Sequence, residues 1–191
     1  MLLPIHRLLK MPVMSLQTGV QLATTASVII DPRKLQIVAF RVHGSRLSHE
    51  NSVLHPEDIR EISEIGLIVD DDSALMSTDG LVRLQEVIDF KFDLDGPRAE
   101  NENGKFIGKV SSYAVDQDSL IVQQLYTKPS TLRSIVATGL TIHRKQIVSI
   151  NNQRIVVKDP TVPVDEEKQL TRSGFINPFR STNPLTTPPK S

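Results

Sequence analysis

Apolar and β-branched residues recur in short alternating runs along most of the chain, and turn-forming residues separate these runs. Two such runs flank the tetrapeptide Asp31-Pro32-Arg33-Lys34. Proline at the second position of a turn fixes φ, and aspartate at the first position can accept a hydrogen bond from the turn backbone. The pattern therefore predicts a β-hairpin that pairs Thr24–Ile30 with Leu35–Val42.

The same hairpin pattern occurs a second time in the chain. Phe106–Val115 and Leu120–Tyr126 are alternating runs, and the polar turn Asp116-Gln117-Asp118-Ser119 separates them. Asp31 aligns with Asp116, 85 residues later, and apolar positions pair around it. The alignment indicates that the hairpin has been duplicated.

A second block is repeated at nearly the same spacing. In Ser52–Asp72, a short strand leads through His55-Pro56-Glu57-Asp58 into a second predicted hairpin. The same order recurs in Thr141–Val157, where Ile147 lies 88 residues after Ile59. Two collinear repeated blocks predict two related units of roughly 70–80 residues each. Units of this size have small cores, so we expect the two to pack on each other.

Each unit resembles a PRC-barrel, the small β-barrel named after the photosynthetic reaction centre H subunit. Gly104–Val110 matches the opening G-x-x-(I/L)-G-x-(V/I) phrase, Leu54–Ile59 matches the strand–Pro–x–x–(I/V) phrase, and Gly66–Val69 matches the closing strand. The first unit lacks the second glycine of the opening phrase in Thr18–Leu22, and Arg144 stands in the second unit where Pro56 stands in the first.

The resemblance covers residues 11 to about 159. It implies a mainly β fold of two tandem small PRC-barrel-like β-barrels, packed together, with a short connecting helix and a disordered C-terminal tail. The predicted organisation is a first unit at 11–79, a connector at 80–92, a second unit at 93–159 and a Pro-rich tail at 160–191. The family implies a docking module within larger assemblies and no shared enzyme activity. One member is the C-terminal domain of a ribosome maturation factor.

The connector and the N-terminus have weaker patterns. Asp79 is positioned to cap a short helix with Leu81, Leu84 and Ile88 on one face, and the following alternation of apolar residues predicts a strand up to Leu94. Residues 1–10 predict one amphipathic turn in a loose arm that docks on the body. The expected core residues are Ile30, Ile37, Ile59, Val69, Val115, Val122, Ile147 and Val157.

Composition excludes several classes of protein. Lys+Arg and Asp+Glu both total 22, so no net charge attracts the chain to nucleic acid or to an anionic membrane. The chain has no cysteine, which excludes disulfides, thiolate metal sites and a cysteine nucleophile. No apolar run is long enough to span a bilayer and no signal peptide is evident, so we expect a cytoplasmic protein.

No group of residues predicts catalysis, a cofactor or a metal site. Asp70-Asp71-Asp72 lacks the spaced oxygen ligands of a calcium loop and is typical of a solvated strand end. His55 and His143 occupy equivalent turns, where each is expected to bond the backbone; a metal ion shared between them is the alternative. We therefore expect no enzyme activity.

The tail contains one apolar island. From Pro160 the chain is rich in Pro, Ser and Thr, a composition typical of disorder. Aromatic and arginine side chains anchor many interfaces, so the island predicts a protein-binding motif, either for a partner or for a groove on the units themselves. The candidate residues are Phe175, Ile176, Asn177, Pro178, Phe179 and Arg180.

Three functions are compatible with these features. The first is a non-enzymatic adaptor, in which two barrels bind one protein and the tail recruits another. The second is an RNA- or ribosome-associated assembly factor, and the third is a small-ligand binder between the barrels. The sequence does not specify the protein partner or the oligomeric state. Basic residues of the second unit support the RNA hypothesis: Lys105, Lys109, Lys128, Arg133, Arg144, Lys145, Arg154 and Lys158.

Overall fold

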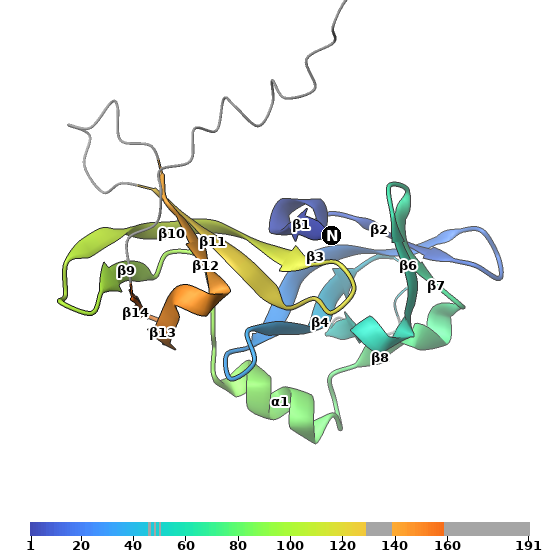
Figure 1. The fold of residues 1–191 in the computed structure, drawn as a ribbon. Helices are drawn as coiled ribbons and strands as arrows, with labels where there is room; N and C mark the ends of the chain where they lie inside the picture. Colours follow the sequence, from blue (N-terminus) through green and yellow to red (C-terminus); the bar gives the residue numbers. More distant parts are fainter. Residues whose placement is uncertain (46, 48, 50, 129–138, 159–191) are drawn as a thin grey trace, which may run out of the picture.

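The protein is mainly β, and in the computed structural model its strands form two mixed sheets accompanied by one short α-helix (Figure 1). The structure describes residues 1–45, 47, 49, 51–128 and 139–158. The first sheet has the strand order β6–β7–β2–β3–β4–β5–β8. Its strands are β2 (Pro12–Ser15), β3 (Gln21–Asp31), β4 (Gln36–His43), β5 (Ser52–Leu54), β6 (Ile59–Ser63), β7 (Gly66–Val69) and β8 (Leu75–Ser77).

The second sheet repeats the order of the first, as β13–β14–β9–β10–β11–β12. The strands in this order are β9 (Arg98–Asn101), β10 (Phe106–Asp116), β11 (Val122–Lys128), β12 (Thr141–His143), β13 (Ile147–Ile150) and β14 (Arg154–Val157), and β1 joins the sheet beside β10. Each sheet contains one parallel pair at the same place, β2 with β7 and β14 with β9. The other neighbouring pairs are antiparallel, so the two sheets share both order and direction.

The two long hairpins have equivalent registers. Ile30 lies opposite Ile37 in the first, and Val115 lies opposite Val122 in the second. Both hairpins contain two register shifts, and these fall at positions that the sequence alignment equates. A bulge bends a strand and increases its twist, so equivalent bulges give the two hairpins the same bend. The register agrees with the alignment predicted from the sequence.

The sheets do not close into barrels within the described residues, so the prediction of two closed barrels is wrong. Strands β6 and β8 are the edges of the first sheet, and β13 and β12 are the edges of the second. Strand β5 ends at Leu54, and the 3-10 turn η2 (Pro56–Asp58) redirects the chain into β6, which pairs with β7 instead. The turn η4 (Arg144–Gln146) does the same between β12 and β13.

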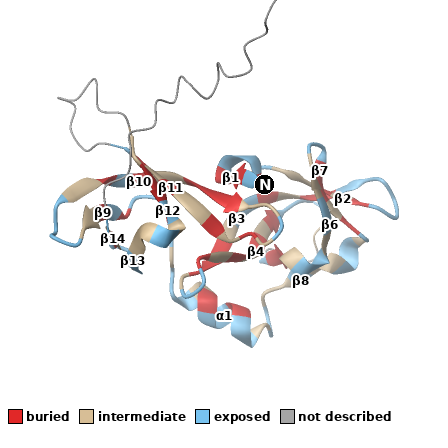
Figure 2. Cartoon of the chain, in the orientation of Figure 1, coloured by how far each residue is buried: buried red, intermediate tan, exposed pale blue. Residues whose placement is uncertain are grey.

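A continuous apolar core extends through both sheets (Figure 2). The alternating residues of the long hairpins supply much of it, as the sequence predicts. Ile59 and Ile147 are only partly buried, because each begins an edge strand. The other predicted core residues are buried: Ile30, Ile37, Val69, Val115, Val122 and Val157.

The connector differs from its prediction. Helix α1 spans Val82–Asp89, its N-cap residue is Leu81, and no side chain caps it, so Asp79 does not have the predicted role. Its buried side chains pack on β3, β4 and β5 in a second, smaller apolar cluster. The predicted strand up to Leu94 is absent from the described fold, because Lys91 adopts a left-handed φ of 47° and Asp95 donates its N–H to Asp93 Oδ1.

The N-terminal segment is integrated into the second sheet. Strand β1 (Leu2–Pro4) pairs antiparallel with the end of β10, and the 3-10 turn η1 (Ile5–Arg7) follows. Leu8 is fully buried, and its carbonyl accepts a 2.7 Å hydrogen bond from the buried Thr25 Oγ1. The expectation of a loose arm is therefore wrong. The segment pairs with one sheet and packs on β3 of the other.

Candidate protein-binding surfaces

The turns of the two long hairpins bond to each other at the junction between the sheets. Ile37 donates its N–H to the carbonyl of Leu120 at 3.0 Å, and Val122 donates its N–H to the carbonyl of Leu35 at 2.8 Å. Because Leu35 aligns with Leu120 and Ile37 with Val122, the two bonds are reciprocal. Leu35 and Leu120 both have a positive φ, 50° and 54°, so the two turns meet in the same conformation.

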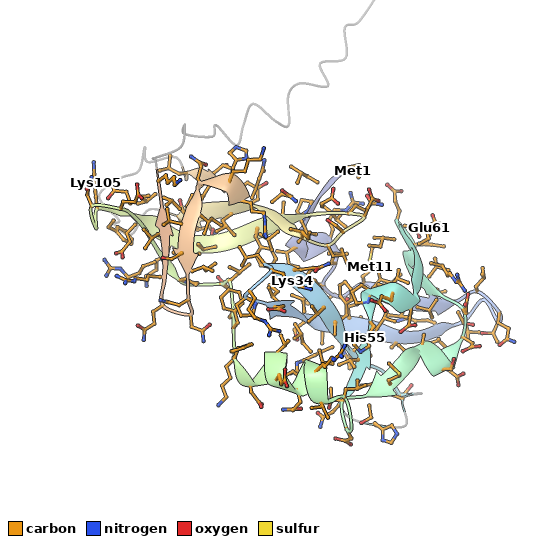
Figure 3. All side chains as sticks on the ribbon, turned by 60° about the horizontal axis from the view of Figure 1, so that its bottom comes forward. Met1, Met11, Lys34, His55, Glu61 and Lys105 are labelled. Carbon is orange, nitrogen blue, oxygen red and sulfur yellow. The ribbon has the colours of Figure 1, made fainter. Side chains whose placement is uncertain are left out.

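Arg144 strengthens this junction from the second unit. Its Nη2 donates to the carbonyl of Lys34 at 2.8 Å, and its Nη1 donates to the carbonyl of Val122 at 3.4 Å. Lys34 lies in the middle of the molecule, where the sheets meet (Figure 3). Arg144 occupies the position of Pro56 in the first unit, so this departure from the repeat has a structural role that the sequence did not indicate.

A groove of about 530 Å³ lies beside the junction and is lined by both units. The first unit contributes β6 and the turn before it, and the second contributes the β10–β11 turn. Gln117 Nε2 donates to the carbonyl of Ile62 across it at 3.5 Å. This groove is where the small-ligand hypothesis placed a site. Its lining residues are Gln36, Pro56, Glu57, Ile59, Arg60, Glu61, Ile62, Gln117, Asp118, Ser119 and Leu120.

A larger groove of about 610 Å³ lies within the first unit. Its walls come from the β2–β3 turn, from β5 and β8, and from the residues that precede α1. Three carboxylates, Asp71, Asp72 and Asp79, line it alongside apolar side chains. We call it the acidic groove. Its apolar lining residues are Val20, Leu22, Leu47, Leu75, Met76 and Leu81.

Two aspartates of the triplet have separate partners. Asp70 pairs with Arg60 at 2.6 Å on the surface, and the Arg60 hydrogen bond lowers the pKa of that carboxyl. Asp71 Oδ1 accepts the N–H of Ser73 at 2.9 Å, and the Ser73 hydroxyl and N–H lower its pKa. In the described part of the chain, no three His, Asp or Glu side chains form a group that could hold a metal ion.

The two aligned histidines begin equivalent 3-10 turns. His55 is the N-cap residue of η2 and has no side-chain cap bond. His143 is the N-cap residue of η4, where its N–H donates to Gln146 Oε1 at 2.9 Å. The His143 ring Nδ1 lies 3.5 Å from Gln124 Nε2. The predicted bond between histidine side chain and backbone is found for His143, whose side chain accepts the backbone N–H of Gln146 in a capping box, and is not found for His55.

The described basic residues of the second unit have different surroundings. Lys109 and Lys128 are direct cross-strand partners and both are exposed. Arg144 donates a hydrogen bond to Lys34 at the junction, and Arg154 forms an ion pair with Glu100 at 3.2 Å. Lys105 lies at the far end of the second sheet (Figure 3). Arg133 lies outside the described residues.

A buried carboxylate holds the turn of the first hairpin. Asp31 is 4% exposed, and Arg33 binds it with Nε and Nη2 at 2.9 Å each. The Arg33 guanidinium also lies 5.5 Å from the centroid of the Phe90 ring. The hydrogen bond and charge of Arg33 lower the pKa of Asp31 against the opposing effect of burial. This ion pair ties the hairpin turn to the end of α1.

We predict that this ion pair makes stability depend on pH. Because the folded state lowers the pKa of Asp31, the stabilisation is complete above the ordinary value of 3.8 and is lost as pH falls below it. The unfolding free energy of the wild type should therefore exceed that of Asp31→Asn at pH 7, and the difference should shrink below pH 3.8 in urea titrations. Asp118→Asn, which changes an exposed carboxyl in the other hairpin turn, is the control. A constant difference from pH 7 to pH 3 would contradict the assignment.

The candidate motif Phe175–Arg180 lies outside the described residues. No protein-family model matches the chain. A search of curated proteins finds no significant match. Among the described residues, none of the helices has the length and apolar character that crossing a bilayer requires.

Proposed function

We propose that this protein is a non-enzymatic adaptor built from two PRC-barrel-like units, and that the acidic groove binds an extended segment of a partner protein. The lining of the acidic groove is the main observation that supports this proposal. Apolar lining residues such as Leu22 and Leu75 offer contact area, while Asp71, Asp72 and Asp79 offer negative charge. This combination fits a peptide that alternates apolar and basic side chains.

The junction between the units supports an adaptor function, because it holds a surface of one unit at a fixed position relative to a surface of the other. The reciprocal backbone bonds at Ile37 and Val122 join the units, and the Arg144 side chain adds a bond to the carbonyl of Lys34. The N-terminal strand adds a further connection, because it pairs with β10 and continues into the first sheet. A partner bound at the acidic groove would then be held at a fixed distance from a second partner on the other unit.

The groove hypothesis is tested by a crosslinking pull-down from native cells. Met76 is 37% exposed and lines the acidic groove, whereas Val82 is 71% exposed and lies outside it. Met76→Lys removes an apolar contact and adds a charge that repels basic side chains, so it should weaken capture of the specific partner at least tenfold, which corresponds to about 1.4 kcal/mol. Val82→Lys introduces the same charge outside the groove and should leave capture unchanged. Equal capture by both variants would contradict a docking role for the groove.

The tail motif is predicted to recruit a second partner. Phe175 and Phe179 can each bury roughly 150–250 Å² in an interface. Replacing both with Ser should abolish tail-dependent binding, and the melting temperature should change little because the described core lies elsewhere. Binding is measured with wild-type and doubly substituted protein, and Thr186→Ser with Thr187→Ser is a control within the tail. A partner set that is the same for all three proteins would leave the motif without a role.

The RNA hypothesis is the second candidate, and the facing Lys109 and Lys128 favour it. Like charges directly opposite each other are unfavourable unless an anion binds between them. RNA affinity that falls steeply between 50 and about 200 mM salt would support this function. Lack of RNA binding at low salt would exclude it.

A further inference from the structure

The two units differ at one edge of their sheets. In the first unit, β8 pairs antiparallel with β5, so that Val53 lies opposite Met76. Strand β12 is the counterpart of β5, and in the second unit β12 forms the edge of the described sheet. An edge strand presents unpaired N–H and C=O groups that can pair with another strand.

The hydrogen-bond pattern shows which groups are open at this edge. Thr127 donates its N–H to the carbonyl of Leu140 at 2.9 Å, which makes these two residues a hydrogen-bonded pair. Hydrogen-bonded and non-hydrogen-bonded pairs alternate in antiparallel sheets. The next pair, Tyr126 with Thr141, is therefore non-hydrogen-bonded, and the N–H and C=O of Thr141 point away from β11. Thr141 is a buried residue, 7% exposed, and the backbone groups of buried residues are usually hydrogen-bonded.

The first unit shows how such groups are satisfied. Thr78 donates its N–H to the carbonyl of Asn51 at 3.1 Å, so alternation makes Val53 and Met76 the next hydrogen-bonded pair. Val53 is the counterpart of Thr141. The residues before β8 form the 3-10 turn η3 (Asp72–Ala74), which Asp71 caps by accepting the N–H of Ser73.

Residues 159–165 lie outside the described part of the chain, but their sequence aligns with the segment that completes the first unit. At the same spacing of 88 residues, Asp159 matches Asp71 and Thr161 matches Ser73, so an aspartate and a hydroxyl residue again stand two positions apart. Pro160 matches Asp72, the first residue of η3, and proline is favoured at the first position of a helical turn. Pro163 matches Leu75, whose N–H points away from β5, while Val164 matches Met76 and supplies an N–H.

We propose that the open edge of β12 is the docking site for residues 163–165 of the same chain, which pair with it antiparallel as β8 pairs with β5. Val164 then lies opposite Thr141 and exchanges both backbone hydrogen bonds with it. If residues 163–165 pair with β12, the disorder predicted from Pro160 onward begins only after them. Composition predicts disorder there because it takes no account of an edge strand to which these residues can bond. It does not depend on the proposed adaptor function.

Amide hydrogen exchange at Thr141 in the full-length protein tests the proposal. Val164→Pro removes the N–H that would bond to the Thr141 carbonyl and distorts the pair, so the Thr141 amide should exchange at least tenfold faster than in the wild type. Asp165→Pro is the matched control, because the aligned Ser77 is at a non-hydrogen-bonded position. It should leave the protection of Thr141 nearly unchanged. Melting temperatures of all three proteins check that the sheets remain folded.

A cysteine pair provides a second measurement, because the chain has no cysteine of its own. Leu140 should lie opposite Asp165 at a non-hydrogen-bonded position, where a cross-strand disulfide fits. Leu140→Cys with Asp165→Cys should oxidise faster than Leu140→Cys with Val164→Cys, whose side chain would point to the other face.

Three results would overturn the proposal. The first is equal Thr141 exchange in the wild type and in Val164→Pro. The second is equal oxidation rates of the two cysteine pairs. The third is Thr141 protection that increases with protein concentration, or that arises only when another protein is added, since either result would assign the edge to a second chain.

Discussion

Val115→Asp is expected to destabilise the second sheet strongly. Val115 is fully buried in the core and pairs with Val122 beside the junction. A carboxylate placed in this apolar core would be a buried, uncompensated charge, which costs about 3–5 kcal/mol. In a protein of this size that loss lowers the melting temperature on the order of 10 °C. Thermal unfolding followed by circular dichroism measures it.

Val148→Asp is the matched control for this change. Val148 lies in edge strand β13 and is 47% exposed, so the same substitution places its carboxylate in water. Its effect on stability should stay within about 0.5 kcal/mol. If Val115→Asp retained a cooperative transition at the wild-type temperature, the placement of Val115 in the core would be wrong.

Leu8→Ala is the second change with a large expected effect. Leu8 is fully buried beneath the first sheet, although it belongs to the N-terminal segment that the sequence predicted to be loose. Truncating a buried leucine to alanine costs about 2–5 kcal/mol, because contacts are lost and a cavity remains. Urea denaturation should show a lower midpoint with an unchanged slope.

Leu2→Ala separates burial from strand pairing in the same segment. Leu2 pairs with Asp116 through the backbone, but its side chain is 44% exposed. Alanine preserves the backbone bonds and removes little buried area, so the midpoint should barely move. Equal midpoints for the two variants would show that the N-terminal segment does not contribute to the core.

The repeat made the register of the long hairpins predictable. Alternation places side chains on one face or the other, and comparing the two copies fixed which residues are equivalent. Asp31 and Asp116 also marked both turns correctly, because each accepts a backbone hydrogen bond within its turn. Local chemistry and the duplication were sufficient for these elements.

The short strands were not predictable in the same way. Strand β9 has the sequence Arg-Ala-Glu-Asn, in which only Ala99 is fully buried, and it resembles a polar loop until it pairs with β10 and β14. Strand β8 has three residues, too few to show alternation. Closure of the sheets depends on whether distant edges meet, and no local pattern specifies this. These short strands can therefore be identified only from the tertiary structure.

The acidic groove was missed for a related reason. Its lining comes from segments between Ser15 and Leu81, and no sequence pattern indicates that these segments converge. Asp71 and Asp72 were correctly interpreted as lying at a strand end, yet their position beside apolar residues became apparent only with β8 in place. The motif Phe175–Arg180 was identified by composition and remains a prediction.

The reciprocal bonds between the hairpin turns have a consequence for the origin of this architecture. A contact in which each partner offers the same surface is the arrangement that a symmetric homodimer of a single unit uses. Joining the two copies in one chain replaces a concentration-dependent association with an intramolecular one. It also allows the two copies to differ in sequence. One copy can acquire Arg144 where the other keeps Pro56, and helix α1 can cover one hairpin without having to cover both.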